Sequence, residues 1–285
     1  MLTIDEYNAT EAKAIQVLPV MHRDNIWGID PDKYALRVDD LDALIPLLDR
    51  MHIRDRFECF QYELGGLSND DVSRIANAAR KVLDLQAQHM SLANAVIPYS
   101  TLLATFAVRR KMKDAKPDVK SILEIGPGAG LTALYFEQDK QIEFYASIDS
   151  TQGRYLLQSL VHDAAYSKDW CEAAKDPREA HCTDRALHVP WWKISQLYNN
   201  PMKFDVITAN DCLNEMTDQA LGSYLNIFGS KCHDDTLVLI QDQGTYIFRD
   251  DNKLKCLLML SQAAAALLII ENSAASGAPI KARNH

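Results

Sequence analysis

The chain has 285 residues, of which 47% are hydrophobic and 24% charged, a composition that supports a sizeable core and excludes a disordered chain. Asp and Glu (39) outnumber Lys and Arg (30), which gives a formal net charge of -9, so we expect no nucleic acid as the main partner. The six cysteines form no C-x-x-C pair, which argues against a disulfide scaffold or a zinc ribbon.

Neither the first residues nor the most apolar run predicts a membrane or secretory segment. Residues 1–15 carry early acids and no basic region followed by an apolar stretch, so we expect a cytoplasmic protein. The run 256–270 is shorter than the ~20 residues that cross a bilayer. It predicts a buried helix that continues into a strand, and no membrane association.

Residues 1–117 are predicted to form a helical N-terminal segment. Apolar residues recur at helical spacing over 39–51, and Ser68 with Asp71 resembles a capping box that opens a long helix to about residue 90. A third helix is expected over 100–113, before Pro117. We expect this segment either to cover a substrate opening or to make a homodimer contact.

From residue 118 to 285 the pattern changes to short apolar strands that alternate with helices. The predicted strands are 121–125, 143–149, 204–210 and 236–242, with a further one at 267–272; a third strand of the sheet is expected to end near His188. Near-continuous apolar runs are typical of parallel strands that are buried on both faces. The sequence therefore predicts an α/β domain with a doubly wound, mostly parallel sheet.

A glycine-rich loop follows the first of these strands. Gly126, Gly128 and Gly130 are spaced G-x-G-x-G, and Glu124 precedes them by two residues. In an open parallel sheet ligands bind beyond the carboxyl ends of the strands, where this loop lies. A dinucleotide fingerprint needs G-x-G-x-x-G, which disfavours a nicotinamide oxidoreductase. The alternative without a ligand is a tight strand-to-helix turn.

The pattern acidic-x-G-x-G-x-G resembles the first motif of class I S-adenosylmethionine-dependent methyltransferases. The resemblance implies a Rossmann-like fold for residues 118–285 and S-adenosylmethionine as cofactor. It also implies that Gly126, Gly128 and Gly130 hold the methionine end of the cofactor, with Glu124 near its amino group or orienting the loop.

A second carboxylate, Asp149, ends the second predicted strand. A carboxylate in this place can accept hydrogen bonds from both ribose hydroxyls, and the adjacent Ser150 is expected to contribute to the same part of the cofactor site. The alternative is that Asp149 caps a helix that starts near Thr151.

The exit of the fourth strand is the predicted site of chemistry. Asn210 is expected to contact the cofactor, Asp211 and then Glu215 are the candidate general bases, and Asn214 is expected to position a substrate hydroxyl. The stretch lacks the proline and the aromatic residue of N-P-P-Y-type amino-methyltransferases. The alternative is that Glu215 merely begins a helix over 218–228.

This exit, the segment after Asp149 and the Pro190-Trp191-Trp192 element are loosely similar to a family of sugar O-methyltransferases. The resemblance implies methyl transfer to a hydroxyl of a small polar acceptor, a sugar or glycoside first. The alternatives are a protein or nucleic-acid acceptor and a cofactor-binding partner protein without catalysis. Asp211 with Asp242 also suits Mg²⁺, although metal dependence is not favoured and no metal ligands are assigned.

Overall fold

The computed structural model describes residues 2–17, 37–50, 64–175, 184–199, 201–210, 212–213, 216, 218–242, 267–272 and 280–281. The α-helices are α1 (Ile4–Ile15), α2 (Ile45–Arg50), α4 (Asn69–His89), α5 (Tyr99–Ala115), α6 (Thr132–Glu137), α7 (Gln152–Tyr166), α8 (Ile194–Asn199) and α9 (Asp218–Lys231). Three 3-10 helices are η2 (Asp42–Leu44), η4 (Leu92–Asn94) and η5 (Trp191–Lys193). The strands are β1 (Ser121–Ile125), β2 (Phe144–Asp149), β3 (Trp170–Glu172), β4 (Ala186–Pro190), β5 (Val206–Asn210), β6 (Leu237–Asp242), β7 (Leu267–Asn272) and β8 (Ile280–Lys281).

The strands within the described residues form one sheet in the order β3-β4-β2-β1-β5-β6-β7-β8. Neighbours from β3 to β7 pair in parallel, and the two-residue strand β8 pairs antiparallel with β7. The chain runs outward from β1 through β2 to β4, then crosses to β5 on the other side of β1. This reversal makes the carboxyl ends of β1 and β5 the topological switch point of the sheet, which is where open α/β sheets bind their ligands.

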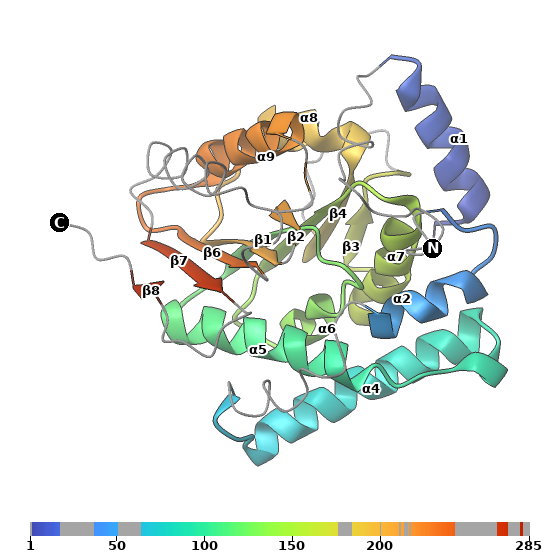
Figure 1. Cartoon of the computed structure of the whole chain (residues 1–285), viewed down its shortest axis with the longest axis horizontal. Coiled ribbons are helices and arrows are strands. Elements are labelled where there is room, and N and C mark those ends of the chain that lie inside the picture. The colour runs from blue at the N-terminus through green and yellow to red at the C-terminus, as the bar shows by residue number, and fades with distance from the viewer. Residues whose placement is uncertain are drawn as a thin grey trace.

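Helices cover both faces of this sheet. Figure 1 shows α5, α6 and α7 on one face, with α4 packed outside them, and α8 and α9 on the other. β1, β2, β4 and β5 are almost wholly buried, as their apolar runs predicted. The architecture is a Rossmann-like, doubly wound α/β fold, and this prediction is confirmed.

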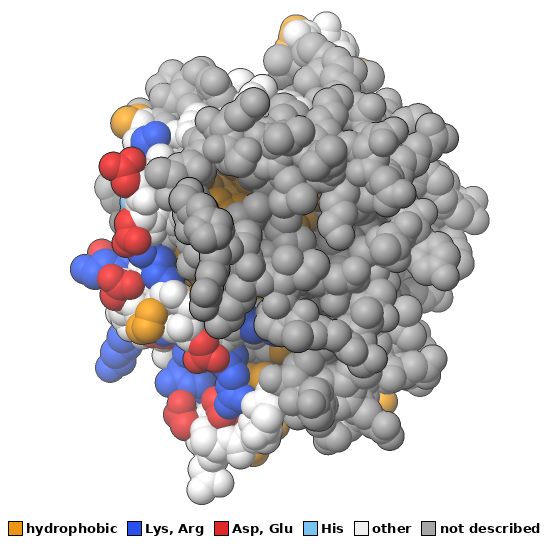
Figure 2. Space-filling model, turned by 60° about the vertical axis from the view of Figure 1, so that its left-hand side comes forward, with side chains coloured by type: hydrophobic (Ala, Val, Ile, Leu, Met, Phe, Trp, Pro, Cys, Tyr) orange, Lys and Arg blue, Asp and Glu red, His pale blue; other side chains and the backbone are white. Residues whose placement is uncertain are grey.

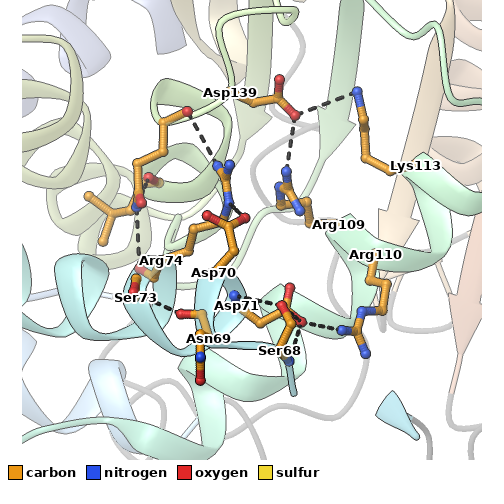
Figure 3. A network of polar contacts seen from close by, with 12 residues as sticks. Ser68, Asn69, Asp70, Asp71, Ser73, Arg74, Arg109, Arg110, Lys113 and Asp139 are labelled. Carbon is orange, nitrogen blue, oxygen red and sulfur yellow. Dashed lines mark hydrogen bonds and ion pairs between the residues drawn. The ribbon is translucent and has the colours of Figure 1, made fainter. Parts of the chain in front are cut away.

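Charged pairs join α4 to α5 and join α5 to the residues that follow α6. Asp71 at the start of α4 lies 2.5 Å from Arg110 of α5, and Asp139 after α6 pairs with Arg109 at 3.0 Å (Figure 3). Lys113 contacts the same Asp139 carboxylate at 3.5 Å. On the described part of the face drawn in Figure 2, basic and acidic side chains are interspersed. The division of the chain at residues 117 and 118 stays a prediction.

Most predicted elements are confirmed, and one helix boundary is wrong. The capping box at Ser68 is present, because Ser68 Oγ accepts from the Asp71 amide and the Asp71 side chain accepts from the Ser68 amide. The helix expected over 39–51 instead begins as η2 and becomes α-helical only at Ile45. Pro46 explains this, because proline has no N–H and fits the first turn of a helix better than its interior. Residues 256–266 lie outside the described chain.

Candidate active site

The loop after β1 adopts a backbone that requires glycine. Gly126, Gly128 and Gly130 have φ of 61°, 61° and 74°, in the left-handed region that other residues rarely adopt. A Cβ on Gly126 would lie 2.8 Å from Cβ of Cys212, and one on Gly130 would lie 2.9 Å from Cγ of Gln158. Backbone conformation therefore explains all three glycines, and lack of space also explains Gly126 and Gly130.

The carboxylate of Glu124, two residues before the loop, accepts hydrogen bonds from residues of α6 and β2. Its Oε2 accepts hydrogen bonds from Thr132 Oγ1 at 2.8 Å and Tyr145 Oη at 2.7 Å, and the residue is only 3% exposed. Burial raises the pKa of Glu124, while hydrogen bonds from Tyr145, Thr132 and Asn210 oppose the shift. These contacts join β1, β2 and the first residue of α6. That Glu124 orients the loop or meets a cofactor amino group stays a prediction.

Asp149 at the end of β2 is buried and already accepts several hydrogen bonds. Its Oδ1 accepts from the amides of Ser150 and Thr151 at 2.7 and 2.9 Å and from Thr151 Oγ1 at 3.1 Å. Its Oδ2 accepts from Gln158 Nε2 at 2.7 Å. The N-cap of α7 is Thr151, and none of the donors to Asp149 is a backbone amide of α7, so the described contacts do not make Asp149 a helix cap. Oδ2 has one described donor, so it retains capacity to accept another.

The end of β5 and the residue Cys212 that follows it lie beside the same loop. Asn210 Nδ2 donates to Thr208 Oγ1 at 3.2 Å, and its Oδ1 is buried without a hydrogen-bond partner among the described residues. Cys212 Sγ lies 3.2 Å from the carbonyl oxygen of Ile125, at the end of β1. The predicted catalytic candidates Asp211, Asn214 and Glu215 lie outside the described residues.

Helix α1 lies at the carboxyl edge of the sheet, against residues that follow β2 and β4. Gln152 at the start of α7 donates to Asn8 Oδ1 at 2.7 Å, and Trp191, directly after β4, donates to Glu11 Oε1 at 2.9 Å. Glu11 is 3% exposed and also lies 2.5 Å from Arg37. The N-terminal helix is thus bound to the residues that follow two strands of the sheet (Figure 1).

Tyr7 is the residue of α1 that enters the core. Its ring centroid lies 5.4 Å from that of Tyr155 and 5.0 Å from that of Trp192, and its Oη is buried without a hydrogen-bond partner in the described chain. Burial, with a smaller contribution from the charges of Glu11 and Asp149, raises the pKa of Tyr7 well above its usual value. Tyr7 therefore stays a neutral phenol near the Asp149 carboxylate.

Sequence analysis did not predict the residues that donate hydrogen bonds to Glu124 and Asp149, namely Thr132, Tyr145 and Gln158. They lie 8, 21 and 9 residues from the carboxylates they contact. One signal was available for Gln158. It is a polar residue in the middle of the apolar sequence Leu156-Leu157-Gln158-Ser159-Leu160, where an amide needs a buried partner.

The described chain offers no metal centre and no membrane span. No three His, Cys, Asp or Glu side chains within it are arranged to hold a metal ion. Asp211 and the side chain of Asp242, the two groups considered for magnesium, lie outside it. None of the described helices combines the length and the apolar character that crossing a bilayer requires.

Comparison with known proteins decides the family. A sequence model described as a methyltransferase domain matches residues 99–266, more than half of the chain. This chain belongs to the methyltransferase domain family. The methyltransferase family that the first motif implied is thereby confirmed, and the glycine loop and the sheet order agree with the class I, Rossmann-like fold. No curated protein sequence matches the methyltransferase significantly.

Two solved structures are similar to this methyltransferase at low identity. One is a coclaurine N-methyltransferase bound to N-methylheliamine and S-adenosylhomocysteine, at 12% identity and a TM-score of 0.33 over 82% of this chain. The other is an O-methyltransferase family protein from Burkholderia thailandensis, at 15% identity and a TM-score of 0.32 over 90% of this chain and 83% of the other. The methyltransferase described here spans 57% of the coclaurine enzyme.

Proposed function

We propose that this methyltransferase binds S-adenosylmethionine at the carboxyl ends of β1, β2 and β5 and methylates a hydroxyl of a small polar acceptor, such as a sugar or glycoside. The observation that carries the cofactor part is the loop of three left-handed glycines beside the buried Asp149 carboxylate. The acceptor part rests on the Asn-, Asp- and Glu-containing sequence from Asn210 to Glu215 and on the net charge of -9.

The residues at the carboxyl ends of β1, β2 and β5 fit this cofactor. Residues without side chains at 126, 128 and 130 let the backbone approach a ligand closely, and Asn210 Oδ1 is a buried acceptor without a described partner. Because Asp149 Oδ1 already has three donors, a ribose hydroxyl would donate to Oδ2. Ser150, 9% exposed, lies next to this carboxylate.

The protein's part in the reaction is to place the acceptor oxygen in line and to remove its proton. When bound, S-adenosylmethionine would supply a methyl group activated by its sulfonium, and transfer of that methyl group to the acceptor oxygen would release the neutral thioether S-adenosylhomocysteine. We assign the proton to Asp211, with Glu215 as the second candidate and Asn214 as a hydrogen-bonding partner of the acceptor hydroxyl. A positioned general base contributes about 10²- to 10⁴-fold to such a rate.

Calorimetric titration of the full chain with S-adenosylmethionine, S-adenosylhomocysteine and NAD, each with and without Mg²⁺, tests the cofactor. We expect both adenosyl compounds to bind and NAD not to bind. Binding of NAD alone would contradict the proposal, and binding of none of them would favour a partner-binding protein. A dependence of affinity on Mg²⁺ would bring back the metal-assisted alternative.

A pair of glycine variants makes this test specific to the loop. Gly128→Val puts a branched side chain at φ 61° inside the loop, and Gly65→Val imposes the same strain at φ 59°, where nothing lies within 4 Å. We expect only Gly128→Val to abolish adenosyl binding. A methyl-transfer screen with glycosides, amines and peptides then identifies the acceptor, and transfer to amines alone would refute the hydroxyl assignment.

A further inference from the structure

Gln158 is a fully buried amide that connects two parts of the proposed cofactor site. From the middle of α7 its Nε2 donates to the carbonyl oxygen of Gly128 at 2.8 Å and to Asp149 Oδ2 at 2.7 Å. Both partners only accept hydrogen bonds, so the nitrogen of the amide must face them and both of its hydrogens are used. One side chain thus fixes the distance between the glycine loop after β1 and the carboxylate after β2.

His188 holds the other end of this amide. Gln158 Oε1 lies 3.0 Å from His188 Nε2, and because the oxygen only accepts, Nε2 must carry a hydrogen. His188 Nδ1 lies 3.4 Å from Glu172 Oε2. Burial acts to raise the pKa of Glu172, but its interactions with His188 and hydrogen bonds from Tyr155 and the Ala174 amide lower it overall.

The His188 ring lies between the amide of Gln158 and the carboxylate of Glu172. His188 is 0% exposed and its ring stacks on Tyr155 at a centroid distance of 3.7 Å, which leaves it no room to turn. Tyr155 Oη donates to Glu172 and also lies 3.1 Å from the carbonyl oxygen of His188. The amide of Gln158 therefore cannot flip without bringing its oxygen against two acceptors and its nitrogen against a donor.

We propose that Gln158 is a positioning residue for S-adenosylmethionine: oriented by His188 and Glu172, it sets the spacing between the glycine loop and Asp149 that the cofactor requires. This inference rests on the proposed function. Gly130 supports it, because a Cβ there would lie 2.9 Å from Cγ of Gln158. The third glycine thus makes room for this side chain to reach the loop.

The test compares two buried glutamines of the full chain by calorimetric titration with S-adenosylhomocysteine and by thermal unfolding. Gln86 is also 0% exposed, and it bonds backbone groups of Val82 and Val96, away from the loop. We expect both Q158L and Q86L to lower the melting temperature. Only Q158L should weaken S-adenosylhomocysteine binding, by about tenfold or more, because it alone releases Gly128 and Asp149.

A second variant, Q158E, tests the inference if Q158L does not fold. Q158E preserves the shape and the contact to His188, but it places a carboxylate against Asp149 Oδ2 and the Gly128 carbonyl. We expect weak binding at neutral pH that recovers, relative to the wild type, as the pH falls and the new carboxyl regains a proton to donate. A purely structural role would not produce this recovery.

The outcomes separate the inference from the proposed function. If the wild type fails to bind S-adenosylhomocysteine, the proposed function is wrong and the inference falls with it. If the wild type binds but Q158L and Q158E bind within twofold of it, the inference alone is overturned. Weaker binding by Q86L than by Q158L would also overturn it.

Discussion

Replacement of Gly126 by alanine tests how closely the loop after β1 approaches the exit of β5. At φ 61° an alanine costs about 1–2 kcal/mol, because Cβ then crowds the neighbouring backbone. Its Cβ would also lie 2.8 Å from Cβ and 2.9 Å from Sγ of Cys212, well inside contact distance. Overpacking of this kind costs about 1–3 kcal/mol, so we expect a total loss of about 2–5 kcal/mol.

Two other glycines separate backbone strain from the steric clash. Gly65 has φ 59° and nothing within 4 Å of an added Cβ, so Gly65→Ala should lose only the strain, about 1–2 kcal/mol. Gly222 lies within α9, also with nothing within 4 Å, and Gly222→Ala should stabilise the protein by about 1 kcal/mol. The difference between the Gly126 and Gly65 variants measures the clash alone.

Urea unfolding of the full chain, followed by circular dichroism, gives these free energies of unfolding. In a Cys212→Gly background, which removes both clashing atoms, Gly126→Ala should cost no more than Gly65→Ala does. If Gly126→Ala costs the same as Gly65→Ala in the wild-type background, Cys212 does not press on the loop and the reasoning is refuted.

Three further predictions concern turnover, stability and pH. Asp211→Asn should lower turnover by about 10²- to 10⁴-fold with unchanged cofactor affinity, and full activity of this variant would remove Asp211 from the mechanism. Ser68→Ala should lower the free energy of unfolding by about 1 kcal/mol, measured in urea, because it removes the cap of α4; an unchanged value would show that the cap is not needed. The hydrogen bond from Lys175 lowers the pKa of Glu6 from 4.5 to about 2, so Glu6 stabilises the fold above pH 4.5 and this contribution is lost as the pH falls towards 2. The stability difference between wild type and Glu6→Gln should therefore shrink between pH 5 and pH 2, and a constant difference would contradict the assignment.

The central strands β1, β2 and β5 were predictable from sequence because each is buried on both faces. SILEI and VITAN appear as unbroken or nearly unbroken apolar runs, and their observed bounds are 121–125 and 206–210. The strand at 170–172 gives no such signal, because its three residues are only partly buried and one of them is Glu172. The antiparallel pairing of the two residues of β8 is likewise invisible in a pattern so short.

Local motifs predicted the glycines and Asp149 of the candidate site, whereas the side chains that contact Asp149 depend on tertiary packing. The glycines are detectable because G-x-G-x-G lies in one loop, and Asp149 because it ends a strand. The partner of Asp149 is Gln158, two turns into α7, and His188 reaches that amide from another strand. Spacing along the chain cannot show these contacts, because the contacts depend on how α7 packs over β2 and β4.

The docking of α1 has a consequence for the order in which the chain folds. Glu11 meets Trp191 across 180 residues of sequence, Glu6 meets Lys175 across 169, and Asn8 meets Gln152 across 144. Loop closure over such separations is slow and must wait for the sheet that carries the partners. During synthesis α1 is made before these partners, yet it finds its place only after η5 has been made and β4 has joined the sheet.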